Sequence, residues 1–217
     1  MKKTLYSLML NEEVVREIDL LAHRMGTNRS NMVNQILADY VSVTTPERRV
    51  NDIFRAVEAM LSPSPELVPF FEPNAMTMSL KSSLEYKYRP TVKYEVELYR
   101  AQDGAMGELS VIFRTQSSSL IAAMTEFFRL WKRIEDAHLA PYTAGSPIEY
   151  ALYEGRFTRS ISMPRGRDYT SEDIAAALSD YIRLFDTLMK GFLSGKYSVR
   201  DVESRYVMHL SETNILI

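Results

Sequence analysis

Apolar and polar residues alternate over the first ten positions of the chain and then change to a helical spacing. The alternation predicts a strand over residues 4–10. Its better apolar face carries the even positions, which are Thr4, Tyr6, Leu8 and Leu10. A lone strand cannot satisfy its own backbone amides, so we expect it to pair with a distant segment or with a second copy of itself.

Two amphipathic helices are predicted directly after this strand. Asn11 is a good N-cap, and an apolar stripe follows at Val14, Ile18, Leu21 and Met25. Gly26 is expected to end the first helix in a left-handed conformation. Asn28 or Thr27 can cap the second helix, whose predicted inward positions are Met32, Val33, Ile36, Leu37 and Tyr40.

A strand and two helices in about 40 residues bury too little apolar surface for a stable monomer. Two-fold pairing solves this difficulty. If residues 4–10 meet the same segment of a second chain as an antiparallel ribbon, the amides are satisfied and the even face covers the helices of the dimer.

The order of these elements resembles the ribbon-helix-helix DNA-binding proteins of the MetJ/Arc/CopG type. The resemblance covers about residues 3–41 and includes "LNEEV" at the first helix and "RMGTNRSNMV" across the turn. It implies a homodimer that lays a two-stranded ribbon in the major groove of DNA, with the start of the second helix against phosphates.

The resemblance also implies the positions that would contact DNA. The base-facing positions would be Lys3, Leu5, Ser7 and Met9, and the phosphate contacts would be Asn28, Arg29 and Ser30. Base edges are read mainly by hydrogen bonds, and only Lys3 and Ser7 offer them here. Asn28 and Ser30 can equally be simple helix caps, with Arg29 in solvent.

The remainder of the chain, residues 46–217, predicts an α+β domain with helices packed on an antiparallel sheet. A hinge is expected near Pro46, then a helix over 51–61 and an extended connector over 62–75. Period-two alternation predicts three strands between residues 76 and 116, and residues 148–164 add strand material. Helical spacing predicts long helices near 117–139, 170–196 and 198–210.

Composition restricts the function without naming it. The chain has 217 residues, no cysteine and a net charge of -2, so neither a disulfide framework nor a thiolate metal site is available. No global positive field attracts nucleic acid or an anionic membrane, and residues 1–45 have five basic and five acidic side chains. No signal peptide or membrane span is predicted, so we expect a cytoplasmic protein. No cofactor or metal is predicted, and the Cys and clustered His ligands that nickel sensing would need are absent from the sequence.

Candidate chemistry in the second part is sparse. Arg156, Arg159, Arg165 and Arg167 lie within twelve residues and can bind an anionic ligand, although a solvated turn paired with acids explains them equally. The strand residues Glu85, Glu95, Glu97 and Glu108 are interpreted as a solvent-facing set. No nucleophile or acid–base motif is recognisable, so no enzyme activity is expected.

Two functions remain in view. The first is a homodimeric transcriptional regulator, a repressor in the simplest case, whose C-terminal domain adds oligomerisation or senses a small-molecule or protein effector. The second is a dimerisation and protein-interaction module, such as an antitoxin or a plasmid-maintenance accessory, with little or no DNA binding. The apolar residues Leu5 and Met9 at base-facing positions favour the second.

Overall fold

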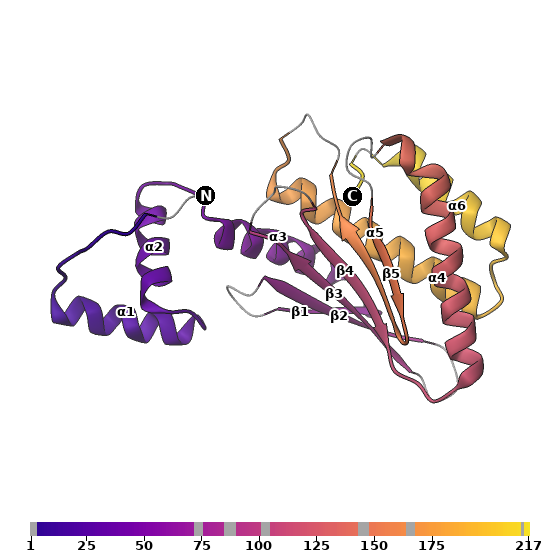
Figure 1. Ribbon diagram of the computed structural model, residues 1–217, viewed down its shortest axis with the longest axis horizontal. Helices are drawn as coiled ribbons and strands as arrows, with labels where there is room; N and C mark the ends of the chain where they lie inside the picture. The colour runs from indigo at the N-terminus through magenta and orange to yellow at the C-terminus, as the bar shows by residue number, and fades with distance from the viewer. Residues whose placement is uncertain are drawn as a thin grey trace.

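The computed structural model describes residues 4–71, 76–84, 90–100, 105–142, 148–163, 168–213 and 215–217. Its helices are α1 (Glu12–Arg24), α2 (Arg29–Tyr40), α3 (Pro46–Leu61), α4 (Ser118–His138), α5 (Ser171–Leu193) and α6 (Val199–Glu212), with a short 3-10 turn η1 (Ala140–Tyr142). Its strands are β1 (Leu67–Phe71), β2 (Thr77–Ser83), β3 (Thr91–Leu98), β4 (Gly107–Phe113), β5 (Tyr150–Tyr153) and β6 (Arg156–Ile161). Figure 1 shows α1 and α2 set apart from a body formed by the sheet and helices α3 to α6, with α3 on the side of the body nearest to them.

The strands form one antiparallel sheet in the order β1-β2-β3-β4-β6-β5. On β3 the alternation is regular, since Val92, Tyr94, Val96 and Leu98 are buried while the residues between them are partly or fully exposed. Because side chains alternate across a strand, one face of the sheet enters the core and the other stays polar.

The main core lies between the apolar face of the sheet and helices α3 to α6. Aromatic rings dominate its centre. Phe128 of α4 stacks on Phe157 of β6 with ring centroids 5.0 Å apart, and Trp131 meets Phe185 of α5 at 4.7 Å. These contacts join helices and strands that are far apart in the sequence, so the second part of the chain packs as one α+β unit (Figure 1).

The α+β class, the antiparallel sheet and the long helices are confirmed. Ser117 is the N-cap of helix α4, and α5 begins with a reciprocal capping box between Thr170 and Asp173. Of the four predicted solvent-facing glutamates, Glu95, Glu97 and Glu108 lie on the polar face of the sheet; Glu85 lies outside the described residues.

Two details of the sequence prediction are wrong. Pro46 does not interrupt a helix but occupies the first turn of α3, after the Thr45 cap, so that α3 begins five residues before the predicted Asn51. Proline suits this position because the first-turn amide has no helical partner. The predicted connector also contains strand β1, in which Pro69 is tolerated because β1 is an edge strand.

The ribbon predicted for residues 4–10 does not form within this chain. Residues 4–10 have no regular secondary structure and no strand pairing, and every strand of the described residues follows α3. The ribbon-helix-helix arrangement therefore stays a prediction, because the second strand it requires belongs to another copy.

Candidate nucleic-acid interface

The segment before α1 is exposed over residues 4–10. Leu5 and Met9 are 98% and 103% exposed, whereas Leu8 and Leu10 are 53% and 43% exposed. Tyr6, which is also at an even position, is 81% exposed, so the single chain does not separate an inward even face from an outward odd one. The predicted base-facing residues Leu5, Ser7 and Met9 are exposed to solvent. Lys3 lies outside the described residues.

Asn11 starts α1 by accepting a hydrogen bond from the Glu13 backbone amide at 3.0 Å. The acidic residues Glu12 and Glu13 lie in the first turn, where the positive end of the helix dipole stabilises them. The predicted cap is therefore confirmed, and it fixes the direction in which the preceding segment leaves the helix.

A tight turn places the start of α2 beside α1. Gly26 has a φ of 59°, the left-handed conformation expected for it. Asn28 is the cap of α2, since its side chain accepts from the Asn31 amide at 3.0 Å. The amide oxygen of Asn28 is thus engaged within the helix, and Ser30 lies exposed beside it.

Arg29 is held by an acidic residue of the neighbouring helix. Its Nε and Nη2 atoms donate to the two carboxylate oxygens of Asp19 at 2.7 and 2.5 Å. This hydrogen bonding lowers the pKa of Asp19 and raises the pKa of Arg29. The pair is solvent-exposed, so a stronger anion can exchange with Asp19 at little free-energy cost.

The core of this N-terminal unit is very small. Only Ile18, Ala22 and Met32 are buried in it, and Leu21, Met25 and Val33 pack partly against them. Large apolar side chains remain exposed around it: Leu5, Tyr6, Leu8, Met9, Leu10, Val14, Leu20, Ile36, Leu37 and Tyr40. Three of the five predicted inward positions of α2, namely Ile36, Leu37 and Tyr40, are thus uncovered in a single chain.

Of the four arginines proposed as an anion site, the two that the structure describes do not come together. On β6, Arg156 points to the polar face of the sheet, where its Nη2 donates to Ser110 Oγ at 2.8 Å. Arg159 points into the core and is fully buried. Arg165 and Arg167 lie outside the described residues.

Arg159 is instead a structural residue. Its Nε donates to Glu135 at 3.0 Å, its Nη2 donates to the Ile217 carbonyl oxygen at 2.5 Å, and its guanidinium lies 4.5 Å from the centre of the Tyr181 ring. Burial is the largest single influence and acts to lower the pKa of Arg159, but Glu135 and the neighbouring tyrosines Tyr181, Tyr150 and Tyr206 together outweigh it, and the net shift is upward. The local sequence contains no signal for this pairing, because Glu135 is 24 residues away.

Comparisons with protein families, with curated proteins and with solved structures find no match to this chain. Among the described residues there is no group of three or more His, Asp or Glu side chains arranged to hold a metal ion. None of the helices described is both long enough and apolar enough to cross a membrane.

Proposed function

We propose that this protein is a homodimeric DNA-binding regulator whose first 45 residues form the dimer and contact DNA. The proposal depends on one observation about the N-terminal unit. Its first segment has no strand partner, its two helices are capped, and its exposed large apolar side chains far outnumber its three buried residues. Apolar patches of this kind mark interaction surfaces.

A second copy of the same unit would supply the missing strand partner and cover the exposed apolar side chains. Two segments of residues 4–10 paired antiparallel would exchange backbone hydrogen bonds, and their even faces would cover Ile36 and Leu37 of both copies. The resulting two-stranded ribbon has the dimensions that the major groove of DNA admits. Ser7 and Lys3 would then supply the polar contacts to base edges.

Phosphate binding would use the start of α2. Arg29, Ser30 and the amides at this helix end suit an anion, and a DNA phosphate would replace Asp19 as the partner of Arg29. With charges balanced over residues 1–45, few counterions are released. We therefore expect modest affinity that weakens with salt.

The test is a fluorescence titration of the full chain against the DNA upstream of its own gene, over a salt series. Arg29→Gln should weaken binding and reduce the salt slope by about one. Asp19→Asn should strengthen binding, because it releases Arg29 from its carboxylate partner. Ser7→Ala should reduce discrimination between the specific site and scrambled DNA.

Arg156→Gln is the matched control, since Arg156 is an ion-paired surface arginine of the other part of the chain. It should leave DNA binding unchanged. Equal losses in Arg29→Gln and Arg156→Gln, or no binding of the upstream DNA at low salt, would contradict the proposed interface.

A protein-interaction module is the second candidate, favoured by one observation. Leu5 and Met9 are almost completely exposed at the positions that would face base edges, where apolar groups contact little besides thymine methyl groups. In this alternative the N-terminal unit dimerises, and the outer face of its ribbon binds another protein. A stable dimer by light scattering that binds no DNA at any salt concentration would support this alternative.

A further inference from the structure

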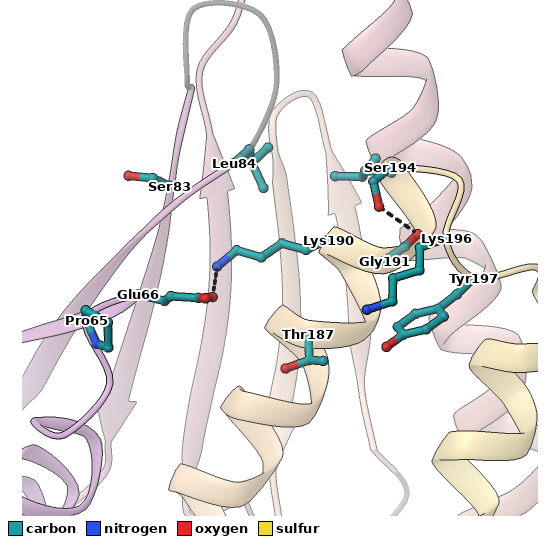
Figure 2. A pocket seen from close by; sticks show the side chains of 11 residues that line it. Pro65, Glu66, Ser83, Leu84, Thr187, Lys190, Gly191, Ser194, Lys196 and Tyr197 are labelled. Atoms are coloured by element: carbon teal, nitrogen blue, oxygen red, sulfur yellow. Dashed lines mark hydrogen bonds and ion pairs between the residues drawn. The ribbon is translucent and has the colours of Figure 1, made fainter.

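A cavity of about 570 Å³ opens beside the edge of the sheet, between the β1–β2 side and the end of α5. Figure 2 shows its walls: Glu66 and Ser83 come from the sheet side, and Thr187, Lys190 and Lys196 come from α5 and the turn that follows it. A volume of this size is in the range of small-molecule sites.

Lys190 occupies the centre of the cavity wall between two carboxylates. Its Nζ donates to Asp186 at 2.7 Å and to Glu66 at 2.9 Å. Burial acts to lower the pKa of Lys190, but the hydrogen bonds to both carboxylates outweigh it and raise the pKa. The ammonium is therefore charged at neutral pH.

The two carboxylates are held very differently. Asp186 is 4% exposed and accepts a hydrogen bond from the buried Tyr94 hydroxyl at 2.8 Å, so it is fixed in the core. Glu66 is 68% exposed and reaches Lys190 from the surface. Exposed ion pairs contribute little stability, so Glu66 can leave Lys190 easily whereas Asp186 cannot.

Across the cavity, Lys196 and Tyr197 form the other wall. The Nζ of Lys196 lies 5.4 Å from the centre of the Tyr197 ring, and Thr187 also lines the cavity (Figure 2). Gly191 makes this arrangement fit, since a Cβ at that position would lie 2.0 Å from the Tyr197 ring. The described residues place no carboxylate within ion-pair distance of Lys196.

From this geometry we infer that the cavity is a binding site for a small organic anion, a carboxylate or a phosphate ester, whose acidic group replaces Glu66 on Lys190. Asp186 neutralises Lys190 from the core side, and the anion completes its coordination from the cavity side. Lys196 attracts the remaining negative charge, and the Thr187 hydroxyl offers a further hydrogen bond. Glu66 is thus an internal competitor for the site.

This inference is independent of DNA binding and is tested on the full chain by isothermal titration calorimetry. The probes are inorganic phosphate and the dicarboxylate succinate, titrated separately at low ionic strength. We expect at least one to bind, and their relative affinities distinguish a phosphate site from a carboxylate site. Glu66→Gln should bind the probe about two- to fivefold more tightly than the unaltered chain. The variant removes the carboxylate that competes for Lys190, and the free energy gained is that of an exposed ion pair.

Lys190→Met should abolish binding, and Lys196→Met should weaken it several-fold. Lys190→Met leaves Asp186 without its ammonium partner, so circular dichroism must confirm that this variant is folded. If it does not fold, the Glu66 and Lys196 variants test the inference instead. Lys132→Met is the matched control, since Lys132 forms an exposed ion pair with Asp136 on α4, away from the cavity.

Three results would overturn the inference: neither probe binds the unaltered chain or Glu66→Gln, Glu66→Gln binds more weakly, or a folded Lys190→Met binds as well as the control. None of these results depends on whether the N-terminal unit contacts DNA.

Discussion

Arg156 and Arg159 show how strongly a single residue's environment decides its role. The two arginines are three positions apart on β6, so they lie on opposite faces of the sheet. Arg156 pairs with Ser110 and Glu108 at the surface, while Arg159 and Glu135 are both fully buried. Removing one partner of a buried pair leaves the other charge uncompensated, at a large free-energy cost.

We therefore expect Arg159→Met to lower the free energy of unfolding by about 3–5 kcal/mol. Urea denaturation followed by circular dichroism measures the loss. Arg156→Met, the control on the same strand, should change stability by no more than about 1 kcal/mol. Adding Glu135→Gln to Arg159→Met should recover part of the loss, and a double variant as unstable as the single one would show that the charge of Glu135 is not the cause.

The environment of His209 predicts that the stability of the protein depends on pH. Burial lowers the pKa of His209 below the ordinary 6.5, although the nearby charges of Asp180 and Glu212 partly oppose the shift. A histidine whose pKa is lower in the folded state binds fewer protons there than when unfolded. Its contribution to stability is thus complete above about pH 6.5 and is lost as the pH falls from there through the folded-state pKa.

Unfolding curves at pH 7.5 and 5.5 test the direction of this pH dependence. The unaltered chain should lose more stability between the two values than His209→Gln, which keeps a neutral polar side chain next to Thr213. His23 and His138 are present in both proteins, so their contributions cancel in the comparison. An equal loss in both proteins would rule out His209 as the source.

Helix α2 is the element in which local sequence and available packing disagree most. Its cap and its apolar stripe specify an inward face, yet Ile36, Leu37 and Tyr40 are exposed in the single chain. A helix gains most of its stability from packing its apolar face. The missing packing partner is, in our proposal, the second copy.

Leu37→Glu should therefore shift the protein from dimer to monomer, because it would place a charge in the proposed interface. Sedimentation equilibrium measures the change. Met208→Glu is the control, since Met208 is a similarly half-exposed apolar residue on α6, in the other part of the chain. If both variants sediment as the unaltered chain does, α2 does not contribute to the dimer.

The sequence predicts those helices and strands whose positions are set by hydrophobic periodicity and by capping residues. The stripe of Leu120, Met124 and Phe127 specifies α4, and the Thr170 capping box specifies the start of α5. Strand β1 escapes prediction because its two exposed apolar residues, Val68 and Phe70, and its central Pro69 obscure the alternation. Its identity as a strand depends on pairing with β2, which no local pattern encodes.

The candidate sites are less predictable than the fold, for the same reason. The caps at Asn11 and Asn28 follow from local residue types, but the pairing of Arg29 with Asp19 depends on how α1 and α2 pack. The cavity at Lys190 brings residues near 66 and 84 against residues near 190 and 197, and Glu66, one of the two carboxylate partners of Lys190, is 124 positions away. Only the folded chain brings these groups together.

At the scale of the whole molecule, two separate cores divide the chain at the Thr45 cap. The second core includes residues of every helix from α3 to α6, whereas the first has three buried residues. The exposed ion pair between Arg48 and Asp39 spans the junction and contributes little stability. The stability of the first part should therefore depend on protein concentration, and that of the second part should not.

A fragment of residues 44–217, which keeps the Thr45 cap, should be a folded monomer with a single unfolding transition at all concentrations. A fragment of residues 1–45 should be folded when concentrated and should lose helical circular dichroism on dilution, because its apolar face is covered only in the dimer. The full chain should then show a concentration-dependent transition for residues 1–45 and a concentration-independent one for the rest. Helicity of the 1–45 fragment that does not change on dilution would contradict a core shared between two copies.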